Sequence, residues 1–198
     1  MVEEALSFAN SHAIPVDAVA VSEGPGSYTG LRIGYSMAKG VAYGYNVPLI
    51  ALSTLEVLCV PVLLKPELSD CADAAPLLIP MIDARRMEVY SAVYDRALHP
   101  VRGVQADVVD ADTYREYLDR GPVYFFGDGS AKVQSVIQHP NARFLPEICP
   151  LAQYMFPLAE RRWARQEYAD VAYSEPFYLK QFEAKPSRDM LHQLKNDK

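Results

Sequence analysis

The sequence predicts an α/β fold with two lobes, and three observations lead to that prediction. Short apolar segments of strand length alternate with segments of helical periodicity along the 198-residue chain. Half of the residues are apolar, which is enough to bury a core in one domain or in two small lobes. A loop rich in proline and acidic residues divides the chain at about residues 65–76. We therefore expect lobes at residues 1–64 and 77–182, followed by a disordered, charged tail at residues 183–198.

The first lobe is expected to contain two helices and two strands. Residues 1–13 have apolar side chains at helical spacing, and Pro15 ends that pattern. A buried strand, a glycine-rich turn, a long helix and a second apolar strand should follow, at residues 17–22, 23–30, 30–46 and 48–52.

The second lobe is expected to open with a hairpin. Segments 77–81 and 87–94 flank Asp83-Ala84-Arg85-Arg86, which indicates two antiparallel strands. The remaining elements should be a strand at 101–109, a helix at 112–120, a strand at 123–126, a helix from 130 to about 138 and a helix at 151–167. Between strand and helix, Asp128 or Ser130 is expected to cap the helix N-terminus, and the alternative is a phosphate-binding turn.

The helix after the first glycine-rich turn has an unusual composition. Gly30, Gly34, Ala38 and Ala42 form a row with a spacing of four residues, next to Ile33, Met37, Gly40, Val41 and Gly44. Because each interior glycine costs a helix about 1 kcal/mol relative to alanine, several of them indicate a close approach of another backbone. Either the helix packs tightly on its own sheet, or this row faces a helix of a partner.

The sequence shows no self-sufficient catalytic site. The turn at residues 22–30 fits neither the Walker A pattern nor GxGxxG, so a tight structural turn is favoured over phosphate binding. His12, His99, His139 and His192 are isolated, so neither a metal site nor a bound cofactor is expected. A net charge of −6 disfavours unaided nucleic-acid binding. Three distant cysteines and the lack of a membrane-length apolar run favour a cytoplasmic protein.

Two charged groups require an interpretation. Asp83, Arg85, Arg86 and Glu88 at the predicted hairpin are expected to form a solvated group of salt bridges. Arg161, Arg162 and Arg165 form a short basic helix face, which is either solvated or makes a modest contact with RNA or with acidic groups of a partner.

Several motifs together resemble the TsaB (YeaZ) family. They are the segment from Ser22 to Gly34, Ala38-Lys39-Gly40, Leu52-Ser53-Thr54-Leu55, the segment from Pro80 to Tyr90, and Tyr178-Leu179-Lys180. The resemblance covers about residues 1–182. It implies an actin-like ATPase (ASKHA, ribonuclease H-like) fold with two lobes. Members of this family usually begin with strands before the helix at residues 1–13, so the first lobe is expected to be partial.

The resemblance also implies a function. The family is the non-catalytic scaffold in making N6-threonylcarbamoyladenosine at position 37 of tRNAs that read ANN codons. Its partners are the catalytic paralogue TsaD, in a heterodimer, and the small ATPase TsaE, and tRNA is reached only through the complex. Alone, such proteins form homodimers through the same surface. ATP and ADP are handled by the partner subunits. Whether a nucleotide also binds at the partner interface is left open. The alternative is an actin-fold nucleotide hydrolase or kinase that acts on its own.

The partner-interface residues implied by this resemblance lie on the first two helices. They are Ala5, Leu6, Gly30, Gly34, Met37, Ala38 and Val41.

Overall fold

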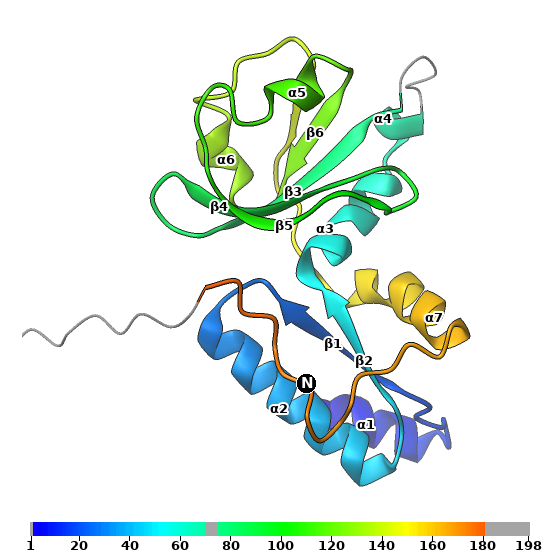
Figure 1. The fold of residues 1–198 in the computed structure, drawn as a ribbon. Coiled ribbons are helices and arrows are strands. Elements are labelled where there is room, and N and C mark those ends of the chain that lie inside the picture. Colours follow the sequence, from blue (N-terminus) through cyan, green and yellow to red (C-terminus); the bar gives the residue numbers. More distant parts are fainter. Residues whose placement is uncertain (1, 70–74, 181–198) are drawn as a thin grey trace, which may run out of the picture.

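The computed structural model describes residues 2–69 and 75–180, which form two lobes connected by a helix and by a returning segment of the chain (Figure 1). The tail predicted at residues 183–198 lies outside the described residues, and so do residues 70–74 of the predicted boundary loop. Among the described helices, none combines the length and the apolar character needed to cross a bilayer.

The first lobe is built on two parallel strands. Strand β1 (Val19–Gly24) pairs with β2 (Leu49–Ser53), and α2 (Tyr28–Tyr45) makes the crossover that a parallel pair requires. Helix α1 (Val2–Ser11) precedes them. These four elements confirm the predicted order, and α2 ends where Asn46 adopts the left-handed conformation with φ 53°.

The second lobe contains a mixed five-stranded sheet with the order β5-β4-β3-β6-β7. Strands β3 (Leu77–Asp83), β4 (Glu88–Tyr94) and β5 (Pro100–Val108) form an antiparallel meander, which confirms the predicted hairpin. Strands β6 (Val123–Phe126) and β7 (Ala142–Leu145) then pair in parallel with β3 and with each other. A meander followed by parallel strands is the sheet expected of a ribonuclease H-like lobe.

The helices of this sheet are shorter than the sequence pattern predicts. Helix α5 covers only Arg115–Leu118, and α6 covers only Ser130–Val133. Neither Asp128 nor Ser130 caps α6, so that prediction is wrong: Asp128 accepts a hydrogen bond from the Asp83 amide, and Ser130 donates one to the Gly127 carbonyl.

Close packing explains the glycine in this turn. Gly127 has φ 95°, and a Cβ there would lie 2.2 Å from the Met81 carbonyl oxygen. The turn is therefore shaped by its approach to β3, which only glycine permits.

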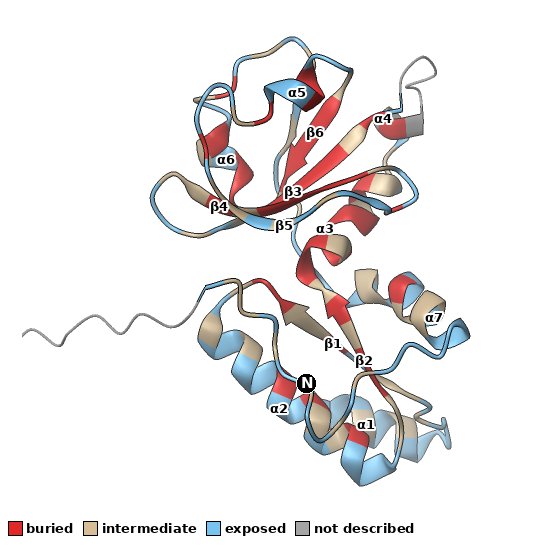
Figure 2. Ribbon diagram, in the orientation of Figure 1, coloured by how far each residue is buried: buried red, intermediate tan, exposed pale blue. Residues whose placement is uncertain are grey.

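Helix α3 (Thr54–Leu63) joins the lobes and is buried along most of its length, and α4 (Pro66–Ser69) follows it. Its apolar side chains share one core with Leu78 of β3, Phe126 of β6 and Leu158 of the last described helix. Figure 2 shows this buried helix between the two sheets. The lobes thus share a core through α3.

The chain returns to the first lobe at its C-terminal end. After the 3-10 turn η1 (Ala152–Met155), helix α7 (Phe156–Ala164) packs beside β2, and residues 168–178 run along α2 (Figure 1). We call residues 168–178 the strap. The sequence places residues up to 182 in the second lobe; in the structure α7 packs beside β2 and into the shared core, and the strap contacts α2 of the first lobe. The predicted helix at 151–167 is interrupted because the 3-10 turn precedes α7, whose first turn contains Pro157.

Candidate partner interface

Helix α2 buries one side against its own sheet and exposes the other. Tyr35, Ala38 and Ala42 lie in the core of the first lobe with Val21 and Leu49. Figure 2 shows that the rest of α2 is mostly exposed and that α1 has no buried residue. Ala38 and Ala42 thus account for the close approach of α2 to its own strands.

The glycines of α2 do not serve that packing. A Cβ built on Gly34, Gly40 or Gly44 would meet no atom within 4 Å, and one on Gly30 would meet only the Ser27 side chain, at 3.5 Å. Packing on its own sheet therefore does not explain why this helix contains four glycines.

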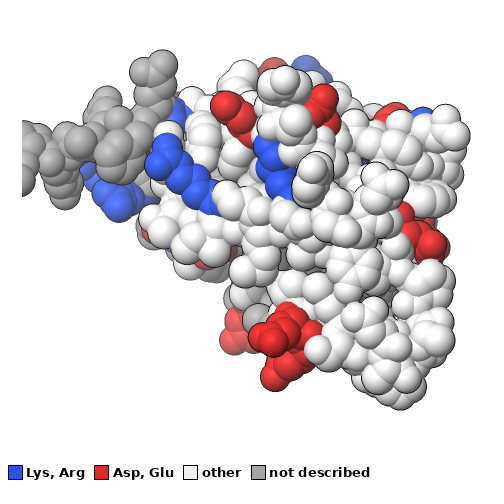
Figure 3. All heavy atoms as spheres, turned by 90° about the horizontal axis from the view of Figure 1, so that it is seen from below, with Lys and Arg blue, Asp and Glu red and all other residues white. Residues whose placement is uncertain are grey.

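Large apolar side chains are exposed on both helices of this lobe. Phe8, Ile33 and Met37 are 58%, 59% and 48% exposed, and Val2 and Ile14 are also exposed. We call the exposed residues Val2 and Phe8 of α1 and Ile33, Gly34, Met37 and Gly40 of α2 the α1–α2 face. Seen from below, this end of the molecule presents mostly uncharged atoms (Figure 3). Exposed large apolar side chains on two helices are the kind of surface that protein–protein contacts bury.

The residues predicted for the interface are distributed unevenly over the two helices. Ala5, Gly30, Gly34 and Met37 are exposed, and Leu6 and Val41 are half-buried. Ala38 is only 8% exposed and belongs to the core of its own lobe, which is why it offers little surface to a partner. Sequence reasoning did not select the exposed Phe8 of α1, although a large apolar side chain on a short amphipathic helix is a signal for such a face.

The glycine-rich turn before α2 is held by contacts within the chain. Gly24 has φ 119°, and a Cβ there would lie 2.6 Å from the Phe177 carbonyl oxygen. The Phe177 amide donates to the Glu23 carbonyl at 2.7 Å, and Ser27 caps α2 by accepting from the Gly30 amide at 3.4 Å. The close approach of the strap thus explains the glycine at position 24, so the turn has a structural role.

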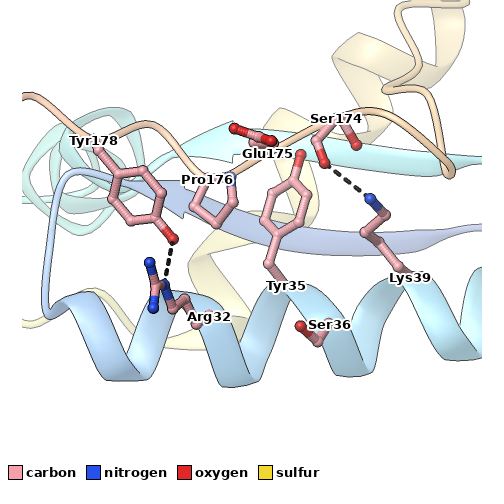
Figure 4. A pocket seen from close by; sticks show the side chains of 8 residues that line it. All are labelled: Arg32, Tyr35, Ser36, Lys39, Ser174, Glu175, Pro176 and Tyr178. Carbon is pink, nitrogen blue, oxygen red and sulfur yellow. Dashed lines mark hydrogen bonds between the residues drawn. The ribbon is translucent and has the colours of Figure 1, made fainter. Parts of the chain in front are cut away.

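The strap is fastened to α2 by charged and aromatic side chains, shown in Figure 4. Lys39 Nζ donates to the carbonyl oxygens of Ala172 at 3.0 Å and of Ser174 at 2.9 Å. Arg32 Nε donates to the Tyr178 hydroxyl at 3.4 Å, and this hydrogen bond raises the pKa of the guanidinium. A cavity of about 290 Å³ remains between strap and helix. These contacts fix the position of α2, and with it the α1–α2 face.

A second cavity, of about 610 Å³, lies between the lobes. Its lining from the first lobe and α3 includes Val21, Gly30, Leu31, Val57 and Leu58, and its lining from the second lobe includes Ile82, Asp128, Ile148, Cys149 and Met155. Neither lysine nor arginine is among the described residues that line it. Among the described residues, no group of three or more His, Cys, Asp or Glu side chains is placed to hold a metal ion.

A partly buried charge cluster connects α7 to α3 and β1. Arg161 and Arg162 lie 3.7 and 3.8 Å from Glu56 Oε2, and Arg162 also pairs with Glu167. All three arginines of the basic face predicted on this helix therefore lie near carboxylates of the chain, since Arg165 is 3.9 Å from Glu167. Burial raises the pKa of the nearby Glu23 carboxyl, against the opposing effect of the Arg162 charge.

Comparisons with known proteins agree with this architecture. A family model described as "TsaD: tRNA N6-adenosine threonylcarbamoyltransferase" matches residues 1–186. The "tRNA threonylcarbamoyladenosine biosynthesis protein TsaB" of Escherichia coli (strain K12) is 28% identical over 190 residues, which cover 91% of this chain and 78% of that protein. The protein of the same name from Bacillus subtilis (strain 168) is 32% identical over 123 residues, 61% of this chain and 50% of that protein.

A solved structure supports the fold. A crystal structure described as an uncharacterized protein with similarity to peptidase YEAZ from Pseudomonas aeruginosa has a TM-score of 0.75 at 24% identity, and the match covers 90% of this chain and 82% of that one. At this identity the likeness concerns the fold, which is the two-lobed, actin-like fold expected from the sequence. Because the family model spans nearly the whole chain and relatives named TsaB match along most of it, the chain belongs to the TsaD family and, within it, to the TsaB (YeaZ) group.

Proposed function

We propose that this chain is a non-catalytic scaffold subunit of the complex that makes N6-threonylcarbamoyladenosine at position 37 of ANN-reading tRNAs. The names of its relatives, which describe threonylcarbamoyladenosine biosynthesis proteins, support this pathway. In this proposal the chain activates a TsaD-type transferase by binding it, and the TsaE-type ATPase docks on the pair. ATP is then used by the partner subunits.

The observation that carries the scaffold role is the α1–α2 face. Gly34, which also borders the inter-lobe cavity, and Gly40 leave open space on α2 away from its own sheet, and Ile33 and Met37 expose apolar surface on the same helix. A glycine row lets a second helix approach closely, and exposed apolar side chains gain free energy when that helix covers them. A TsaD-type paralogue is the proposed occupant, and a second copy of this chain takes its place when the protein is alone.

The alternative is an enzyme that binds and hydrolyses a nucleotide between its lobes. The inter-lobe cavity is large enough for a small ligand, but its described lining is mostly apolar and includes one carboxylate, Asp128. That carboxylate accepts a hydrogen bond from the Asp83 amide, 2.9 Å away. The described lining offers phosphate groups no cationic side chain, which favours the scaffold role.

Reconstitution tests the proposal. This chain, a TsaD-type transferase, a TsaE-type ATPase and the synthase that supplies threonylcarbamoyl-adenylate are mixed with tRNA, threonine, bicarbonate and ATP. The modified adenosine is then measured by mass spectrometry, with and without this chain. We expect modification only when the chain is present. ATP turnover by the purified chain alone that Asp128→Asn abolishes would favour the enzyme instead.

A further inference from the structure

The tip of the β3–β4 hairpin has a backbone conformation that its residues do not favour. Arg85 and Arg86 have φ values of 72° and 50°, so two consecutive non-glycine residues lie in the left-handed region. Glycine and asparagine are the ordinary residues for such positions, and strained backbone of this kind is frequent at functional sites. The presence of two arginines indicates that their side chains have a use that offsets the unfavourable backbone.

The turn is held in this conformation by a lysine from another element. Lys132 of α6 donates to the Asp83 carboxylate and to the carbonyl oxygens of Arg86 and Glu88, which uses all three of its donors. The Asp83 carboxylate also accepts from the Arg85 amide at 2.7 Å. The tip is thus a rigid support for the two arginine side chains.

The acidic groups near the tip are already occupied. Asp83 pairs with Lys132, and Glu88 pairs with Lys180, which lies two residues after the strap. The group of salt bridges predicted here therefore exists, but its cations are lysines from distant segments rather than Arg85 and Arg86. Both arginines are exposed, and their guanidinium groups make no ion pair with any described residue. Two exposed cations, of which Arg85 also interacts electrostatically with Asp83, thus occupy consecutive positions on a protein whose net charge is −6.

We propose that Arg85 and Arg86 form a contact site for the phosphate backbone of RNA. Guanidinium groups recognise phosphate oxygens through charge-assisted hydrogen bonds, and a projecting, rigid tip suits a backbone groove. A protein partner is less favoured, because protein contacts centre on apolar anchors and no large apolar side chain between Leu77 and Tyr94 is exposed.

The position of the tip fits the proposed complex. In Figure 1 the β3–β4 tip lies on the same side of the molecule as the N-terminal end of α2. The segment that carries Tyr178 and Lys180 contacts both lobes here, because Tyr178 accepts from Arg32 of α2 and Lys180 pairs with Glu88 of β4. In the proposed complex, the tip is the part of the second lobe through which this chain would contact the tRNA. This inference rests on the proposed function, and it would make the chain a direct contributor to tRNA binding within the complex.

The test compares two variants in the complex with the TsaD-type partner. The double variant Arg85→Asn/Arg86→Asn removes both charges and keeps residues that tolerate the left-handed backbone. The control is Arg96→Asn, at the turn after the opposite end of β4, because Arg96 is likewise exposed and without an ion pair in the described chain. Light scattering first measures complex formation, and fluorescence anisotropy then measures the Kd for an unmodified ANN-reading tRNA transcript at several salt concentrations.

We expect the double variant to form the complex normally and to bind tRNA roughly tenfold more weakly. The slope of log Kd against log salt concentration should fall in magnitude by about one to two, because one or two phosphate contacts are lost. Its melting temperature should not fall, whereas a merely structural role of the arginines would lower it. The control should match the wild type in every measurement.

Three outcomes would overturn the inference. Unchanged tRNA affinity and salt slope in an intact complex would do so and leave the scaffold proposal standing. A variant that loses affinity for a protein subunit but not for tRNA would assign the tip to an acidic protein instead. If the wild-type complex does not form, the scaffold proposal fails. The chain alone is then titrated with the same tRNA at low salt, and equal affinity of the wild type and the double variant would reject the site.

Discussion

Replacing Gly34 with leucine separates the stability of the folded chain from its ability to associate. Gly34 is exposed, a Cβ there meets no atom within 4 Å, and the residue borders the inter-lobe cavity, so a larger side chain has open space beside it. Leucine is also a better helix former than glycine by about 0.5–1 kcal/mol. For a protein of this size, that gain raises the melting temperature by roughly 1–4 °C.

The effect on association should have the opposite sign. If a partner helix approaches α2 along its glycines, the leucine side chain occupies the space that this helix needs. Overpacking of this kind costs about 1–3 kcal/mol, and each 1.4 kcal/mol corresponds to tenfold in affinity. We therefore expect association with the partner, or with a second copy, to weaken by roughly 5- to 150-fold.

Thermal denaturation and analytical ultracentrifugation measure the two effects on the same samples. Gly34→Ala serves as a graded variant with a similar gain in stability and a smaller loss of affinity. Ser36→Leu adds a large side chain on the strap side of α2 and should leave association unchanged. Unaltered association of Gly34→Leu would show that the glycines of α2 do not face a helix.

Three further substitutions test other parts of the structure. Gly127→Ala should lower the free energy of unfolding by about 2–3 kcal/mol, because its Cβ would lie 2.2 Å from the Met81 carbonyl oxygen; chemical denaturation measures this, and a change below the error contradicts the packing argument. Burial raises the pKa of Glu23 above 4.5, so the folded state binds this proton more tightly than the unfolded chain does. The free energy of unfolding therefore falls as pH rises from 4.5 to the raised pKa of the folded state. Glu23→Gln should therefore flatten the fall in stability from pH 4.5 towards neutral pH, and an unchanged pH profile would refute it. Lys39→Met removes both hydrogen bonds from its ammonium to the strap and should speed hydrogen exchange at the Phe177 amide, while the amides of the second lobe keep their rates as the internal control.

The regular elements could be predicted because their patterns are local. The hairpin of β3 and β4 follows from two apolar strands around a polar turn, and α2 follows from its turn and its length. Strand β7 was not predicted, because Ala142–Leu145 is short and its pairing with β6 is invisible in the sequence. The shortness of α6 depends on how closely Gly127 approaches β3, which no helical pattern reports.

The candidate interface could be predicted in part. The small residues of α2 indicated a close approach, but periodicity could not assign Ala38 to the protein's own core and Gly34 to the surface. That assignment depends on where β1 and β2 lie against the helix. The strap could not be predicted at all, because its contacts, such as that of Lys39 with Ser174, join residues far apart in the sequence and follow no period.

The return of the chain to its first lobe has a consequence for synthesis. The second lobe is in effect inserted into the first, whose last contacts are made by residues 169–178. During translation the first lobe cannot be completed until nearly the whole described chain has left the ribosome, and closing such distant contacts is intrinsically slow. Throughout this time the apolar residues of α1 and α2 are uncovered on an unfinished lobe. The nascent chain should therefore depend on chaperones, or on early capture by its partner, more than its modest size would indicate.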